Sequence, residues 1–213
     1  MRTIIAIACL GLLTGAQPAG AQTTHELKVS RHPNVAISNS EVDTILINAS
    51  RVLQRNSVSR GTRGIGACDV TFKLKGSVET FVSPNTPAIV DEHNIEAVHR
   101  EHSDPNFVSV KVVEDIRFCR SFRSDPSHPI WGCSWPWHYR STIVRRDAPF
   151  PEIVWAHEFG HLTGLWHRGE RTALMTICPL AADQVKVDQI ECSCYLGGPG
   201  SCITPEVDPG CGP

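Results

Sequence analysis

Apolar and polar residues follow two different periods along this chain of 213 residues. From Glu41 to Arg55 the apolar residues recur every three or four positions, and Ser38 and Glu41 have the spacing of a capping box, so this stretch predicts an amphipathic helix. Residues 70–74 and 107–118 instead alternate apolar with polar residues, which is typical of strands with one buried face. Helical and strand periods in one chain predict a fold of the α+β class.

Other segments carry shorter signals. The pattern predicts an extended piece within residues 22–37, a neighbouring strand within 78–82, a strand at 141–145, a helix at 150–164 and one candidate helix near 181–191. Residues 91–106 are polar and residues 119–139 are rich in Pro and Trp, so we interpret both as loops. The stretch from 195 to 213, rich in Gly, Pro and Cys, is interpreted as a tail stapled by disulfides.

The charge balance narrows the classes of function. The chain has 20 Lys and Arg against 22 Asp and Glu, a net charge of −2, which argues against a basic nucleic-acid-binding surface. Hydrophobic residues make up 41% of the chain, enough for a packed core. No apolar run reaches the length of a transmembrane helix, so no membrane span is expected.

The first 21 residues have the composition of a secretory signal peptide. Arg2 supplies a positive start, residues 4–16 are apolar, and Ala19 and Ala21 frame a cleavage site of small residues. The alternative is a buried N-terminal helix. A signal peptide predicts a secreted or periplasmic protein whose mature chain begins at about Gln22 and forms a single domain over residues 22–213.

Eight cysteines remain after the predicted leader, an even number that predicts four disulfides in an exported chain. Cys119 and Cys133 are a plausible pair because their disulfide would close the Pro-rich loop. Cys192 and Cys194 are too close to pair comfortably with each other. Zinc binding by cysteines is the competing interpretation, but the chain has no C-x-x-C pair.

The chemistry of the chain concentrates in residues 157–167. A helix that begins near Pro151 carries His157 and His161 one turn apart on one face, where two imidazoles can hold one zinc ion. Glu158 follows the first histidine, within reach of a water molecule activated by that metal. Gly164 can take a positive φ and end the helix, so that the chain turns and brings His167 back as a third ligand. Three protein ligands leave one zinc position open, as in catalytic sites.

This segment resembles the metzincin clan of zinc metallopeptidases, whose pattern H-E-x-x-H-x-x-G-x-x-H is matched at every fixed position of residues 157–167. The clan's motif is followed by a Met-turn, and Met175 stands eight residues after His167, a spacing similar to that of matrixins. The resemblance implies that Met175 packs beneath the histidines without binding the metal. It covers roughly residues 141–180 and leaves the subfamily open, since Arg168 stands where matrixins usually carry Ser.

The resemblance implies a metzincin-like zincin domain, with a mixed twisted sheet above the active-site helix and a disulfide-rich C-terminal part below the cleft. The implied function is that of a secreted zinc metalloendopeptidase. One Zn²⁺ would be held by His157, His161 and His167, and Glu158 would act as general base. The partner would be a protein or peptide substrate, paired with an edge strand within residues 107–116. A monomer is favoured.

Two other classes of function are open at this point. The first is a catalytically silent zinc-binding extracellular recognition module, against which the intact Glu158 counts. The second is a disulfide-rich binding module built on the tail from Cys178 to Cys211.

Smaller features have alternatives too. His93, His99 and His102 would hold a second zinc ion or, as we favour, lie in a solvated loop. The aromatic residues of the Pro-rich loop would line a substrate cleft or, as we favour, pack that loop; they are Trp131, Trp135, Trp137 and Tyr139.

Overall fold

The computed structural model describes residues 22–55, 68–83, 86–120, 122–135, 140–176 and 178–202. The predicted leader, residues 1–21, lies outside the described residues, as do Trp137, Tyr139 and Cys211. Among the described residues, no helix is both long enough and apolar enough to cross a membrane.

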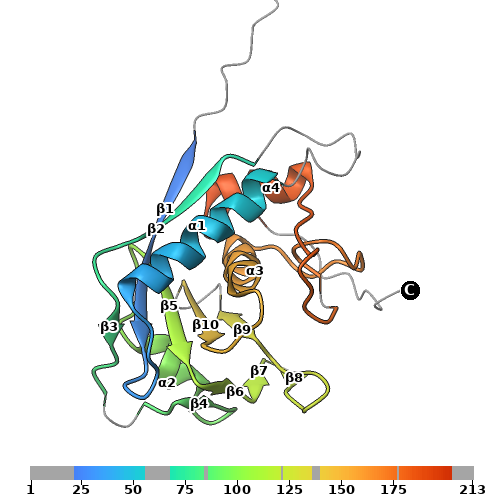
Figure 1. The fold of residues 1–213 in the computed structure, drawn as a ribbon. Helices are drawn as coiled ribbons and strands as arrows, with labels where there is room; N and C mark the ends of the chain where they lie inside the picture. The colour runs from blue at the N-terminus through green and yellow to red at the C-terminus, as the bar shows by residue number, and fades with distance from the viewer. Residues whose placement is uncertain are drawn as a thin grey trace, which may run out of the picture.

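A six-stranded mixed sheet forms the centre of the molecule (Figure 1). Its strands are β1 (Thr23–Arg31), β2 (Val70–Leu74), β3 (Glu79–Thr80), β5 (Val108–Val113), β9 (Gly132–Trp135) and β10 (Ser141–Arg145). The order across the sheet is β2-β1-β5-β10-β9, with β3 also paired to β1. All pairs are parallel except that of β9 with β10, which is antiparallel. Two small sheets pair β4 (Ile89–Val90) with β6 (Asp115–Ile116), and β7 (Phe118–Cys119) with β8 (Phe122–Arg123).

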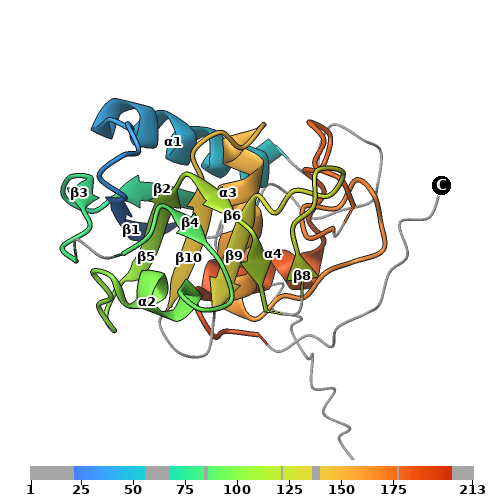
Figure 2. The ribbon, with the colours of Figure 1, turned by 90° about the horizontal axis from the view of Figure 1, so that it is seen from below.

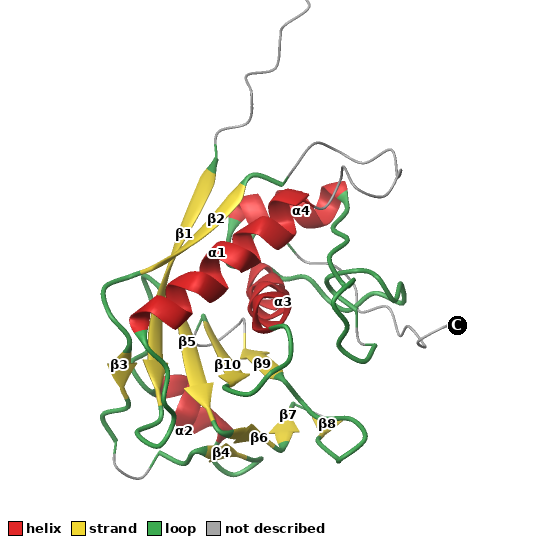
Figure 3. Ribbon diagram, viewed as in Figure 1, coloured by secondary structure: helices red, strands yellow, loops and turns green. Residues whose placement is uncertain are grey.

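In the described part of the chain, four helices accompany the sheet: α1 (Asn39–Arg55), α2 (Ile95–Arg100), α3 (Pro151–Thr163) and α4 (Gln189–Gly197). Alternation along β5 separates two cores, because Val110 and Val112 join the cluster with α1 and α3, whereas Val113 joins the cluster with α2. The sheet therefore lies between α1 and α2, as Figure 2 shows. The segment between α3 and α4 is largely loop (Figure 3). These elements confirm the predicted α+β fold with a mixed sheet.

The helix α1 forms where the pattern predicts it. Its apolar face is buried through Val42, Leu46 and Leu53. The capping box is present, since the amide of Ser38 donates to the Glu41 carboxylate at 2.8 Å and the amide of Glu41 donates to the Ser38 hydroxyl at 3.3 Å.

Several predictions from the pattern were wrong. Residues 132–135 of the supposed Pro- and Trp-rich loop form strand β9, which pairs with β10. Residues 95–100 of the supposed polar loop form α2, because Ile95 and Val98 are buried against the sheet. The candidate helix near 181–191 begins only at Gln189, where Asp188 and Glu191 form a capping box. The strand within 107–116 is no edge strand, because β5 lies between β1 and β10 and all six of its residues are buried. The edge on that side is β9.

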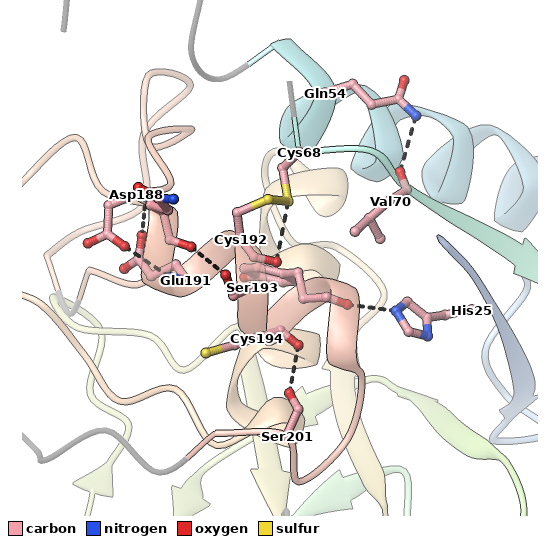
Figure 4. Close-up of a disulfide and its surroundings, with 12 residues drawn as sticks. His25, Gln54, Cys68, Val70, Asp188, Glu191, Cys192, Ser193, Cys194 and Ser201 are labelled. Atoms are coloured by element: carbon pink, nitrogen blue, oxygen red, sulfur yellow. Dashed lines mark hydrogen bonds between the residues drawn. A yellow bond between two sulfur atoms is a disulfide. The ribbon is translucent and has the colours of Figure 1, made fainter. Parts of the chain in front are cut away.

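Disulfides connect the C-terminal part to the rest of the fold. Cys68 pairs with Cys192 across 124 residues and joins the start of β2 to α4 (Figure 4). Cys194 pairs with Cys202, and Cys119 with Cys133 as predicted. Cys178 is also disulfide-bonded. All seven described cysteines are therefore in disulfides, which excludes them as zinc ligands.

Candidate metal centre

The helix α3 carries two of the three histidines. Pro151 occupies its first turn, where a missing amide proton costs little, and Glu152 lies at the positive end of the helix dipole. The helix ends at Gly164, whose φ of 102° is left-handed, as the sequence predicted. A Cβ at this position would also overlap the main-chain oxygen of Cys202. Glycine is thus required both by the turn and by the chain that packs on it.

Three imidazoles meet beside this turn. Nε2 of His161 lies 3.1 Å from Nε2 of His157 and 3.1 Å from Nε2 of His167. Nδ1 of His157 lies 2.7 Å from the carbonyl oxygen of Leu174, and Nδ1 of His161 lies 2.8 Å from that of Leu165. Because a carbonyl oxygen only accepts, both Nδ1 atoms carry the proton, and both Nε2 atoms present lone pairs.

This donor set fits a zinc ion. Neighbouring lone pairs repel one another unless a cation lies between them. Imidazole nitrogens that share a tetrahedral zinc at about 2.0–2.1 Å lie roughly 3.3 Å apart, close to the separations found here. These three histidines also form the one group of at least three potential metal-binding side chains found among the described residues.

Burial keeps the three rings neutral, which is the form that binds metals. Desolvation lowers the pKa of His157, lowers that of His161 well below its usual range, and lowers that of His167 to about 3. A neutral imidazole keeps one lone pair available for a metal.

Glu158 points its carboxyl group towards β9 rather than to solvent. Only 5% of its surface is exposed, and the Ser134 hydroxyl donates to its Oε2 at 2.6 Å. A Cβ on Gly132 would overlap the same carboxyl group, so this glycine makes room for it. Burial raises the pKa of Glu158 to about 7, although the bond from Ser134 opposes that rise. A carboxyl group of this kind both accepts and releases a proton near neutral pH.

Met175 is fully buried against α3. A Cβ on Gly160 would overlap the Met175 sulfur, so the two residues pack closely. The hydroxyl of Tyr195 lies 3.3 Å from that sulfur and 3.0 Å from the carbonyl oxygen of Ala156. Tyr195, from α4, thus holds Met175 beneath the helix that bears the histidines.

The segment of His167 is fixed through the residue after it. The amide of Arg168 donates to the carbonyl oxygen of Met175 at 2.7 Å. Its guanidinium bonds Glu191 at 2.9 Å and Glu170 at 2.9 Å. Because Glu191 is part of the capping box of α4, that helix helps to position the third histidine.

A cavity of about 780 Å³ opens beside the histidines. His157, Glu158, His161 and His167 all line it, together with strand β9 and the turn between β7 and β8. Trp131 and Trp166 line it as well. The cavity is therefore large enough for several residues of a peptide chain.

The sequence singled out six residues here, and the structure places them around one helix: His157, Glu158, His161, Gly164, His167 and Met175. It missed Gly132 and Ser134 from strand β9, Tyr195 from helix α4 and Arg120 from the β7–β8 turn, which belong to no local motif. The histidines of residues 93–102 do not converge, since His99 is buried and His93 is exposed. The solvated loop expected there was wrong for His99.

Comparison with known proteins gives distant similarities. No protein-family model matches the sequence, and a search of curated proteins finds no match. Among solved structures, the chain is similar to metalloproteinase-II from Bacteroides fragilis, with 15% identity and a TM-score of 0.47 over 84% of this chain. It spans 55% of that protein's length.

A zinc-dependent peptidase from Methanocorpusculum labreanum (strain Z) is also similar, with 13% identity and a TM-score of 0.38 over 80% of this chain and 99% of that one.

Proposed function

We propose that the chain is a zinc-dependent endopeptidase with one catalytic zinc ion. The observation that carries the proposal is the convergence of three imidazole rings, in which Nε2 of His161 lies 3.1 Å from Nε2 of both His157 and His167. The buried carboxyl group of Glu158 lines the same cavity. Three neutral ligands with an open fourth position and a neighbouring carboxylate are the parts of a hydrolytic zinc site.

Each residue of the site has a separate role in the proposed reaction. His157, His161 and His167 hold the ion, which supplies Lewis-acid polarisation of the scissile carbonyl and lowers the pKa of water. Glu158 takes the proton from the attacking water and delivers it to the leaving amine as the C–N bond breaks. Ser134 keeps the carboxyl group of Glu158 turned towards the cavity.

The substrate would lie along β9. This strand is the last in the sheet order, and Gly132, Cys133 and Ser134 line the cavity. An extended peptide that pairs with the outer edge of β9 passes the site as an added strand. This proposal replaces the strand within residues 107–116, which has no free edge.

Export and family membership belong to the same proposal. Disulfides are typical of oxidising compartments, which supports a secreted or periplasmic protein made with the leader of residues 1–21. The match of residues 157–167 and the packing of Met175 against α3 support membership of the metzincin clan, with residues 22–213 as one catalytic domain.

The test is cleavage of an unstructured protein by the purified chain from residue 22 onward. We expect cleavage that a zinc chelator abolishes and added zinc restores, with one equivalent of zinc by elemental analysis. Zinc-free protein that cleaves equally well would overturn the proposal. One bound zinc without any cleavage would instead support the silent recognition module.

A further inference from the structure

Arg120 is a charged residue of the cavity that the proposed reaction does not use. It lies in the turn between β7 and β8, with a left-handed φ of 57°, and its side chain lines the cavity. Other arginines nearby are paired: Arg123 with Glu92, and Arg145 with Asp147 at 2.9 Å. No described carboxylate forms an ion pair with Arg120. Its charge is therefore available to a molecule in the cavity.

The position of Arg120 is set by its neighbours. Its guanidinium lies over the ring of Trp166, 4.7 Å from the centroid, and Trp166 precedes His167. The preceding residue, Cys119, is bonded to Cys133 in β9. Arg120 is thus held by the aromatic ring on one side and by the disulfide to β9 on the other.

The charge of Arg120 reaches the centre of the site. The Arg120 side chain lines the same cavity as the three histidines and Glu158. The cavity next to the histidines is therefore electropositive on the side of the β7–β8 turn, and an anionic group placed there is stabilised.

The geometry of the guanidinium defines the ligand. When one face lies on an aromatic ring, the N–H groups along the edge stay free to donate. A planar guanidinium edge matches a carboxylate, with which it forms paired charge-assisted hydrogen bonds. A lysine ammonium offers no such planar pair.

We propose that Arg120 determines specificity by binding a carboxylate of the substrate, so that the enzyme prefers peptides with an acidic group near the cleaved bond. This inference rests on the proposed function of the site. The carboxylate comes from an Asp or Glu side chain or from the C-terminus of the substrate. Both sources offer the same planar anion, and the experiment separates them.

The test compares peptides that differ at one position. Each cleaved sequence is made with Glu or Gln at successive positions around the cleaved bond, and each with a free or an amidated C-terminus. We expect a kcat/KM about tenfold or more higher for one acidic member of such a pair, the worth of a hydrogen bond to a charged group. In Arg120→Gln this ratio falls to near one. Arg120→Glu is also given a peptide with Lys at the same position, and it cleaves this peptide faster than the one with Gln. Arg123→Gln, which removes an arginine already paired, keeps the wild-type ratio.

Two outcomes overturn the inference. A wild-type ratio near one at every position and at the C-terminus shows that no carboxylate is selected. An equal loss for the acidic and neutral peptides in Arg120→Gln shows that Arg120 acts on the peptide bond itself.

Binding separates this inference from the proposed function. Fluorescence anisotropy with labelled peptides and the Glu158→Gln variant, loaded with zinc, measures affinity without turnover. In the protein that keeps Arg120, we expect the acidic peptide to bind more tightly than the neutral peptide. In the protein with Arg120→Gln, we expect the two peptides to bind equally. If the affinities differ in this way but the wild-type protein cleaves no peptide, the carboxylate-binding role of Arg120 stands and the proposed peptidase activity is wrong. Cleavage without any difference in affinity or rate between the peptides would do the reverse.

Discussion

The hydroxyl of Ser134 lies 2.6 Å from Oε2 of Glu158 and 2.8 Å from the main-chain oxygen of the same residue. It also lies 3.1 Å from the Thr142 hydroxyl oxygen. A serine hydroxyl has one proton to donate, so three acceptors compete for it. This arrangement couples β9 to α3 at the one carboxyl group to which we assign the chemistry.

Replacing that carboxyl group tests its role. Glu158→Gln keeps the size of the side chain and leaves all three histidines in place, so fold and zinc content should persist. Turnover should fall by about 10²–10⁴-fold, because general acid–base catalysis is lost. The measurements are kcat on a cleaved peptide and zinc per chain. Wild-type turnover in a zinc-loaded variant would show that Glu158 is not the base.

Ser134 should act on turnover rather than on binding. In Ser134→Ala, Glu158 loses the hydrogen bond that orients it, so kcat should fall about tenfold while KM stays near the wild-type value. Ser134→Thr keeps a hydroxyl and should recover most of the loss. Steady-state kinetics of the three proteins give the comparison. If the alanine and threonine variants lose activity equally, the hydroxyl is not the cause.

Substitution by alanine should destabilise the protein more at Gly164 than at Gly76, another glycine with a left-handed φ. Gly164→Ala adds a strained φ and a Cβ that overlaps the main-chain oxygen of Cys202. Gly76→Ala adds a strained φ alone, since nothing lies within 4 Å of its Cβ. We expect a loss of about 1 kcal/mol of unfolding free energy at Gly76 and a larger loss, with weaker zinc binding, at Gly164. Urea unfolding and zinc titration measure both, and equal losses would contradict the close packing described here.

The buried amine of Lys111 should make stability depend on pH. Burial lowers its pKa to about 7, and its Nζ has no hydrogen-bond partner among the described residues. In the unfolded chain the amine keeps a pKa of about 10.4. Between these values the unfolded chain binds a proton that the folded chain does not, so this group makes the free energy of unfolding rise with pH.

Lys111→Met should therefore stabilise the protein at pH 7, by on the order of 1–4 kcal/mol, and by less as the pH approaches 10. Urea unfolding at a series of pH values measures this difference, with Lys73→Met, at an exposed side chain, as the control. A difference that does not change with pH would show that the amine is charged in the folded protein.

Periodicity predicted the elements whose burial is regular, and it failed where burial depends on distant contacts. The helix α1 has one apolar face along its length, so its position follows from the pattern. The helix α2 has six residues, too few to show a period, and exists because Ile95 and Val98 meet the sheet. The edge of the sheet was wrongly assigned, since alternation along a strand does not reveal which strands lie beside it.

The residues of the candidate site also fall into those that the sequence predicts and those that it does not. His157, Glu158, His161, Gly164 and His167 lie within eleven consecutive residues, so spacing alone brings them together. Ser134 and Gly132 approach Glu158 only because β9 pairs with β10 in antiparallel register. Tyr195 reaches Met175 only because α4 packs on α3. Long-range pairing of this kind leaves no local signal in a single sequence.

The bonds from Arg168 to Glu191 make the shape of the candidate site depend on a helix that follows it in the chain. A growing chain that has reached only Met175 already carries every residue that we assign to metal binding and proton transfer. It lacks Glu191 to hold the segment of His167, and Tyr195 to support Met175 under α3. The site therefore becomes fully shaped only when α4 has been made and docked. Under the proposed function, a chain that stops before α4 would carry all the residues assigned to catalysis without the contacts that hold them in place.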